Sequence, residues 1–270
     1  MTIEQLGLRA RLIRQDIVTM LFEAGSGHVG GALGLADVFA VLYFHTLNVR
    51  PGEPLWPDRD RLVLSAGHVN PVLYSVMAEA GYFERKELLT LRKFGSRLQG
   101  HPHNLELPGI ETSSGPLGQG LSQAIGMALA ARLENKSWHT YAVLSDGEHQ
   151  EGQTWEAIMF AGNRNLSNLT VIVDRNNIQI GGPTEKVMAL DPLADKYRAF
   201  RWNVIEIDGN NLEEIMRALE TKQDDRPTCV IANTIPGKGV SFMENDYRWH
   251  SHPMTQEQYD QAIRELSGHE

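Results

Sequence analysis

Two short stretches decide the fold: Ser145-Asp146-Gly147-Glu148-His149-Gln150-Glu151-Gly152 and, further along the chain, Asp174-Arg175-Asn176-Asn177. Each ends an apolar run rich in β-branched residues, at 141–145 and 169–174, and a helical pattern at 153–165 separates the two runs. Strand, helix, strand in this order predicts parallel neighbouring strands, whose carboxyl ends meet at one edge of the sheet. We therefore expect Asp146 and Asn176 to lie side by side at that edge.

One carboxylate and one amide oxygen at strand ends suit a hard divalent cation. Mg²⁺ prefers six oxygen ligands and commonly takes one or two from the protein, together with phosphate oxygens of a ligand. Gly147 lets a ligand approach the backbone, and the helix that follows offers free N–H groups to an anion. The pair predicts a site for a cation and a phosphorylated ligand.

The rest of the chain extends the same pattern. Further strands are expected at 61–65, 203–207 and 229–233, and helices at 3–24, 36–47, after Pro71, and at 84–94, 192–200, 212–222 and 256–266. Continuous apolar strands alternating with helices are typical of a parallel sheet covered on both faces. No repeat or linker interrupts the pattern, so we predict one α/β domain over residues 1–270.

Composition narrows the class of protein. The 270 residues carry a formal net charge of -9, and an acidic surface disfavours nucleic acid or an anionic membrane as a partner. No apolar run approaches the ~18 residues needed to cross a bilayer. The acidic first helix does not fit a signal peptide, so a cytoplasmic protein is expected. The single cysteine, Cys229, lies in an apolar run and is expected to be a buried structural thiol.

Further motifs place histidines beside glycines in expected loops. They are Ser26-Gly27-His28, Ser65-Ala66-Gly67-His68, Gln99-Gly100-His101-Pro102, Gly115-Pro116-Leu117-Gly118-Gln119-Gly120, Gly237-Lys238-Gly239 and Trp249-His250. In this order and spacing they resemble the N-terminal half of transketolases, from about residue 10 to the last helix. The Asp-Gly and Asn-Asn pair likewise resembles the thiamine diphosphate motif of that family.

The resemblance implies a thiamine diphosphate-binding fold of the kind that holds the diphosphate. It implies thiamine diphosphate as cofactor, with Mg²⁺ or another divalent cation such as Ca²⁺ held by Asp146, Asn176 and the main-chain oxygen of Ile178. His68 is expected near the diphosphate, and the backbone of residues 115–117 near the aminopyrimidine. The implied cofactor-binding residues are His68, Gly115, Pro116, Leu117, Asp146, Gly147, Glu148, Asn176 and Ile178.

The same resemblance assigns four catalytic residues. His28, His101 and His250 would line the substrate channel, where imidazoles can donate hydrogen bonds to a developing alkoxide and move protons near neutral pH. Glu151 would lie near a subunit interface and couple to a glutamate of the partner.

The function implied is that of one subunit of a two-component transketolase. Such an enzyme transfers a two-carbon ketol unit from a ketose (or its phosphate) to an aldose acceptor. The partner would be a C-terminal transketolase subunit with the pyrimidine-binding domain and the catalytic glutamate, and an α₂β₂ heterotetramer is expected because each site lies between domains.

Other functions stay open at this stage. They are the α subunit of a 2-oxo acid dehydrogenase, a deoxyxylulose-phosphate synthase, and a non-catalytic domain that kept the fold. The chain also departs from the family pattern: Ser145 replaces the first glycine of the metal motif, and Ala66 and Pro236 stand where many relatives carry lysine. Because these two lysines are missing near the expected diphosphate, we expect neutralisation of the diphosphate charge to depend more strongly on the metal.

Overall fold

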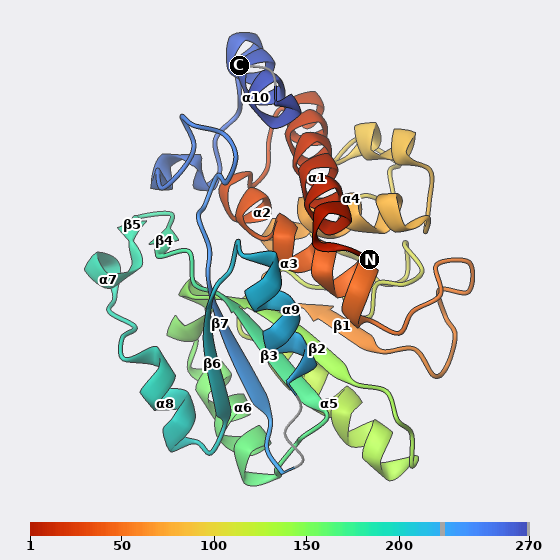
Figure 1. Cartoon of the computed structure of the whole chain (residues 1–270), viewed down its shortest axis with the longest axis vertical. Helices are drawn as coiled ribbons and strands as arrows, with labels where there is room; N and C mark the ends of the chain where they lie inside the picture. The colour runs from red at the N-terminus through yellow and green to blue at the C-terminus, as the bar shows by residue number, and fades with distance from the viewer. Residues whose placement is uncertain (222–224, 269–270) are drawn as a thin grey trace.

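The computed structural model describes residues 1–221 and 225–268, and its centre is one parallel sheet (Figure 1). The strand order is β1-β2-β3-β7-β6, and every neighbouring pair is parallel. A separate antiparallel hairpin, β4 and β5, follows β3. The strands are β1 (Arg61–Leu64), β2 (Thr140–Ser145), β3 (Leu169–Asp174), β4 (Ile178–Gln179), β5 (Gly182–Pro183), β6 (Asn203–Asp208) and β7 (Thr228–Asn233).

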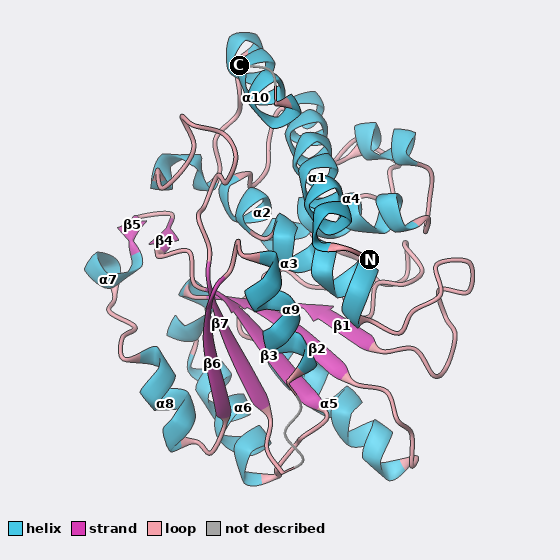
Figure 2. Cartoon of the chain, viewed as in Figure 1, coloured by secondary structure: helices cyan, strands magenta, loops and turns pink. Residues whose placement is uncertain are grey.

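Helices cover both faces of this sheet (Figure 2). One layer contains α1 (Ile3–Ala24), α2 (Gly30–Gly34), α3 (Ala36–Val41), α4 (Asn70–Ala80) and α9 (Leu212–Glu220). The opposite layer contains α5 (Gly120–Leu133), α6 (Gly152–Asn163) and α8 (Leu193–Ala199). The short α7 (Thr184–Val187) follows the hairpin, and α10 (Gln256–Ser267) packs on α1.

Alternate residues of each strand enter different cores. Val143 and Ile172 belong to the core on the α1 side, whereas Ala142, Val171 and Val173 belong to the core on the α5 side. Because successive strand side chains point to opposite faces, a sheet with helices on both sides must be apolar at every position. The uninterrupted apolar runs of the sequence have this cause, and the predicted α/β class with helices on both faces is confirmed.

Several expected boundaries were wrong. The helix expected at 84–94 is a 3₁₀ segment, Arg85–Thr90, because Leu91 leaves helical geometry and Arg92 adopts a left-handed φ of 60°. The helix expected at 36–47 continues from α3 as a π-helical turn, Leu42–Thr46. The helix expected at 212–222 ends at Glu220, and residue 222 lies outside the described residues.

Among the α-helices and strands, four elements were not anticipated: α2, α5, α7 and the β4–β5 hairpin. Helix α5 escaped notice because its apolar residues are spread around the whole helix and form no single stripe. None of the helices within residues 1–221 and 225–268 is long and apolar enough to cross a membrane. Cys229 is a buried free thiol, as expected.

Candidate active site

A cavity of about 340 Å³ opens at the carboxyl ends of the central strands. It brings together segments that are far apart in the sequence, as expected for the ligand-binding edge of a parallel sheet. Eleven of the thirteen predicted site residues line it: His28, His68, His101, Gly115, Leu117, Asp146, Gly147, Glu151, Asn176, Ile178 and His250. The other lining residues are Ser145, Gln150, Gln179 and Ile180.

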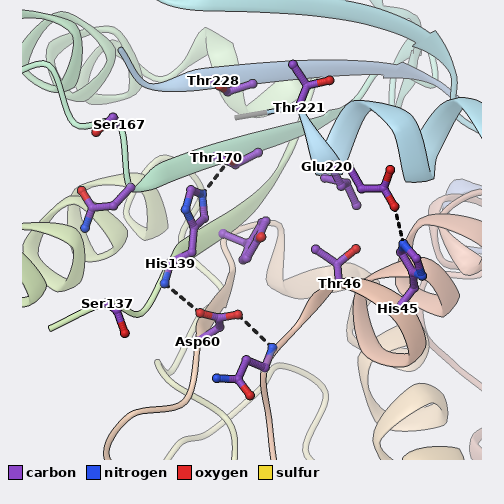
Figure 3. A pocket seen from close by; sticks show the side chains of 14 residues that line it. His45, Thr46, Asp60, Ser137, His139, Ser167, Thr170, Glu220, Thr221 and Thr228 are labelled. Atoms are coloured by element: carbon purple, nitrogen blue, oxygen red, sulfur yellow. Dashed lines mark hydrogen bonds and ion pairs between the residues drawn. The ribbon is translucent and has the colours of Figure 1, made fainter. Parts of the chain in front are cut away.

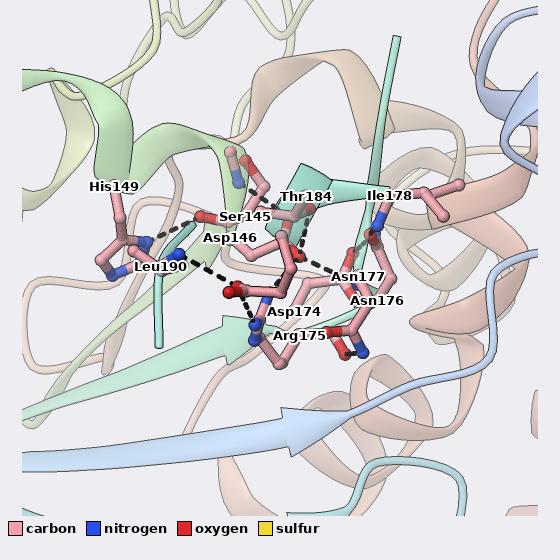
Figure 4. A network of polar contacts seen from close by, with 12 residues as sticks. Ser145, Asp146, His149, Asp174, Arg175, Asn176, Asn177, Ile178, Thr184 and Leu190 are labelled. Atoms are coloured by element: carbon pink, nitrogen blue, oxygen red, sulfur yellow. Dashed lines mark hydrogen bonds and ion pairs between the residues drawn. The ribbon is translucent and has the colours of Figure 1, made fainter. Parts of the chain in front are cut away.

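Strand register brings Asp146 and Asn176 to the same place. Ser145 at the end of β2 pairs with Asp174 at the end of β3, and the Asp146 amide donates to the Asp174 carbonyl at 3.2 Å. Asp146 is 1% exposed, and its Oδ1 accepts from the Gly147 amide at 2.7 Å. Figure 4 shows the Asp146 and Asn176 side chains within one network of polar contacts. The expected approach of the two strand ends is therefore present.

The amide of Asn176 is held in one orientation by its neighbours. Its Nδ2 donates to Asp174 Oδ2 at 2.8 Å, and its Oδ1 accepts from the Ile178 amide at 3.0 Å. The other oxygen of Asp174 accepts from the Thr234 hydroxyl. Burial raises the pKa of Asp174 to about 7, although the bonds from Thr234 and Asn176 act in the opposite direction. An amide fixed in this way keeps the second lone pair of its oxygen available to a ligand.

Arg175 is a buried member of this network that sequence reasoning missed. It is 4% exposed, and its Nη1 donates to Asp146 Oδ2 at 3.1 Å. Burial raises the pKa of Asp146, and the Arg175 charge is the largest of the influences that oppose this rise. The Asp-Arg-Asn-Asn motif indicates oxygen ligands, and the only local signal for Arg175 was its position directly after a buried strand, which does not reveal that its partners are Asp146, Glu185 and Asp191.

Three histidines form a compact cluster in the cavity. Their ring centroids lie 5.0 Å apart for His28 and His68, 5.2 Å for His28 and His250, and 5.4 Å for His68 and His250. Burial and, to a smaller extent, the neighbouring histidines together lower the pKa of His28 to about 4 and that of His68 to about 3. Burial also lowers the pKa of His101 and His250. The four imidazoles are therefore neutral at pH 7, and each can donate one N–H and accept at the other nitrogen.

This protonation state can be measured directly. Because the pKa of His28 and His68 lies well below 6.5, both rings should stay neutral as the pH falls from 8 to 6. We expect ¹⁵N-resolved imidazole NMR spectra to show no titration of these two rings in that range. The exposed His252 serves as the reference, identified by loss of its signal in His252→Gln. A midpoint near 6.5 for His28 or His68 would contradict the proposed environment.

Two predicted cofactor contacts lie outside the cavity lining, namely Pro116 and Glu148. Glu148 is fully buried, where its Oε1 accepts from the Ser65 hydroxyl and from the Gly118 amide at 2.6 Å. Its Oε2 accepts from the Ser145 amide at 3.3 Å. One carboxylate thus joins the chain after β1, the loop before α5 and the end of β2. This contact set gives Glu148 a supporting place behind the cavity wall.

Comparison with known proteins identifies the family. Residues 7–270 match the family described as transketolase, thiamine diphosphate binding domain. The chain belongs to this family. A 6-deoxy-6-sulfo-D-fructose transketolase subunit of Clostridium sp. (strain MSTE9) is 43% identical over 260 residues, which cover 96% of this chain and 94% of that protein. One of the subunits of an apulose-4-phosphate transketolase, from Phocaeicola vulgatus, is 41% identical over 269 residues, which cover 99% and 95%.

A solved structure supports the same assignment. The transketolase of Campylobacter jejuni superposes with a TM-score of 0.93 at 34% identity, covering 99% of this chain and 43% of that one. The chain thus spans less than half of that transketolase, whereas it spans nearly all of the two subunit relatives. The recognition of a transketolase-type transferase subunit with a thiamine diphosphate-binding domain is confirmed. The matches favour this assignment over the α subunit of a 2-oxo acid dehydrogenase.

A second, larger cavity of this transketolase-family chain lies at the opposite edge of the sheet (Figure 3). It measures about 590 Å³ and lies where the strands begin, against residues such as Tyr141, Thr170 and Thr228. Ligands of open parallel sheets bind at the carboxyl ends of the strands, not at this edge. None of the predicted site residues lines this cavity, so the smaller cavity is the candidate active site.

Proposed function

We propose that this chain is the diphosphate- and metal-binding subunit of a two-chain transketolase. The observation that carries the proposal is the convergence, in one cavity, of a fixed Asp146–Asn176 oxygen pair with a cluster of neutral histidines. The oxygen pair accounts for a metal and a diphosphate, and the histidines account for chemistry on a hydroxylated substrate. A non-catalytic domain would have no need for both.

The residues present fit a divalent cation and a diphosphate. Asp146, Asn176 and the main-chain oxygen of Ile178 would supply oxygen ligands, which Mg²⁺ and Ca²⁺ both prefer. Within the described residues no cluster of three or more ionisable or thiolate ligands could hold a metal, so the cation would rely on phosphate oxygens as well. Gln179 beside this site has a buried Nε2 without a hydrogen-bond partner, which fits an anionic oxygen nearby.

Thiamine diphosphate, when bound, supplies a carbanion centre that can accept and release a two-carbon unit. We assign His68 and the backbone of residues 115–117 to cofactor contact, and the Leu117 side chain would pack against the cofactor. His28, His101 and His250 would donate N–H groups to the hydroxyl and alkoxide oxygens of the sugar. Neutral imidazoles suit this task because they can also take up the proton that a sugar hydroxyl loses on becoming an alkoxide, and can return it later.

The sugar is proposed to carry an anionic group. The two subunit relatives are named for a sulfo-sugar and a sugar phosphate. Among the described residues that line the cavity none is lysine or arginine. Recognition of the anionic group is therefore assigned mainly to the partner chain.

The partner is proposed to be a C-terminal transketolase subunit that supplies the pyrimidine-binding domain and the catalytic glutamate. The names of both relatives describe subunits. Glu151 lines the cavity, where it can couple to a carboxyl group of the partner. We propose an α₂β₂ assembly for the pair, and a cytoplasmic location remains a prediction.

The function can be tested by choice of acceptor. The chain is mixed with a candidate C-terminal subunit, thiamine diphosphate and Mg²⁺, and is offered either a phosphorylated ketose with an aldose or a 2-oxo acid with a lipoyl acceptor. We expect two-carbon transfer to the aldose, detected by mass spectrometry of the product sugar, and no acylated lipoyl group. Acyl transfer to lipoyl in place of ketol transfer would refute the proposal.

A further inference from the structure

The buried guanidinium of Arg175 contacts Asp146, whose carboxylate is assigned to the metal (Figure 4). Arg175 Nη1 lies 3.1 Å from Asp146 Oδ2, and its Nη2 lies 2.7 Å from Glu185 Oε1 and 3.3 Å from Asp191 Oδ1. The side chains of Glu185 and Asp191 are 38% and 64% exposed, so water partly screens their charges, less for Glu185 than for Asp191. The Asp146–Arg175 pair is almost fully buried and is screened much less.

The two oxygens of Asp146 have different surroundings. Oδ2 accepts from Arg175, from the Asn177 amide at 2.9 Å and from the Thr184 hydroxyl at 3.1 Å. Among the described residues, only the Gly147 amide donates to Oδ1. Since a carboxylate oxygen offers about two lone-pair positions, Oδ2 is fully used and Oδ1 keeps room for a cation. The geometry assigns Oδ1 as the atom that would contact the metal.

Of the three assigned ligands, only Asp146 carries a charge. Asp146 is compensated by Arg175, while the Asn176 oxygen and the Ile178 carbonyl are neutral. A divalent cation without diphosphate would have to exchange water ligands for a weakly charged ligand set that has a positive guanidinium nearby. Since Mg²⁺ gives up water reluctantly, the affinity for the cation alone should be low. A cation already bound to a diphosphate brings its own negative charge, so the same guanidinium opposes it less.

We propose that Arg175 is a positioning residue that makes the site accept a divalent cation together with a diphosphate and disfavours the cation alone. This inference rests on the proposed function of the site. Arg175 neutralises Asp146 before the ligands arrive, so the fold does not depend on a resident metal. Without the guanidinium, Asp146 would still be held by Asn177 and Thr184, and its charge would be free to attract a bare cation.

The test measures binding of Mn²⁺ to the full chain by electron paramagnetic resonance, with and without thiamine diphosphate. For the wild type we expect the cofactor to raise Mn²⁺ affinity by at least about tenfold. In Arg175→Met, bare Mn²⁺ should bind at least about fivefold more tightly than in the wild type, and the effect of the cofactor should shrink. Arg175→Lys keeps the charge and should resemble the wild type.

A matched control distinguishes the effect of the Arg175 charge on the cation from the general effect of losing a mostly buried arginine. Arg59 pairs with Glu111 through two bonds of 2.8 Å, and neither residue lines the cavity. Arg59→Gln should lower the thermal midpoint without changing Mn²⁺ affinity. If Arg175→Met binds bare Mn²⁺ no more tightly than the wild type, the inference is overturned.

A second variant covers the case in which Arg175→Met does not fold. Glu185→Gln removes a partly exposed carboxylate that offsets the Arg175 charge, so bare Mn²⁺ should bind more weakly. Unchanged or tighter binding in Glu185→Gln would overturn the inference. The comparison of Mn²⁺ binding without cofactor tests only the inference about Arg175. Failure of the wild type to bind thiamine diphosphate, even with its partner, would instead count against the proposed function.

Discussion

Asp146→Asn is expected to lower the affinity for thiamine diphosphate and Mg²⁺ by at least about 100-fold, because changes behind a metal ligand alone cost 10- to 100-fold. Three donors converge on Oδ2 of Asp146, so the amide oxygen of asparagine should occupy that position. The amide nitrogen then takes the place of Oδ1 and presents hydrogen atoms to the cation. Calorimetric titration of the chain with its partner measures the loss.

The fold should survive this change. Arg175 would keep Glu185 and Asp191 as ion-pair partners, so no uncompensated charge is left buried. The matched control is Asp208→Asn, which alters an exposed aspartate at the end of β6, at the same edge of the sheet. The control should bind the cofactor like the wild type. Wild-type affinity in a folded Asp146→Asn chain would remove Asp146 from the ligand set.

The second large effect concerns the partner chain. We expect the purified chain alone to show ketol transfer at least about 100-fold slower than the reconstituted pair, because a positioned acid–base group of the partner is worth 10² to 10⁴ in rate. Rates are measured with the same ketose, aldose, thiamine diphosphate and Mg²⁺, at increasing partner concentration. Saturation of the rate at a fixed ratio of the two chains then reports their stoichiometry.

A mutant partner makes this experiment specific. A partner in which the candidate catalytic glutamate is replaced by glutamine should still associate, as seen by analytical ultracentrifugation, but should restore little activity. Turnover by the lone chain that equals the turnover of the pair would contradict the two-component proposal. In that case the acid–base groups must all belong to this chain.

The parallel pairing of β2 with β3 followed from the sequence because it depends on local patterns. A helical pattern separates the apolar runs that end at Ser145 and Asp174, and this order predicts two neighbouring parallel strands. The register of the two strands then brings Asp146 and Asn176 together. The histidines could be assigned to the same site only through the family resemblance. Nothing in their local sequence says which loops meet across the cavity.

What the sequence did not predict depends on contacts between distant segments. The Glu148 carboxylate accepts hydrogen bonds from Ser65, Gly118 and Ser145. These contacts were not expected, because a glutamate at the start of a helix is commonly exposed. The ion pairs of Arg175 with Glu185 and Asp191, on the segment after the hairpin, could not be predicted either, because they too join separate segments of the chain. Helix α5 was missed because apolar residues outside its buried face, such as Leu129 and the exposed Leu133, obscure the periodic pattern that marks a surface helix.

The one-to-one register between β2 and β3 also limits how this gene can change over evolutionary time. A codon inserted or deleted within β3 (Leu169–Asp174) would move the strand residues that follow it by one position, about 3.3 Å, turn their side chains to the opposite face, and displace Asn176 relative to Asp146. An insertion among the exposed residues 163–165, at the end of α6, would lengthen a surface turn. Related genes should therefore vary in length in that turn and keep a constant number of codons from the start of β3 to Ile178.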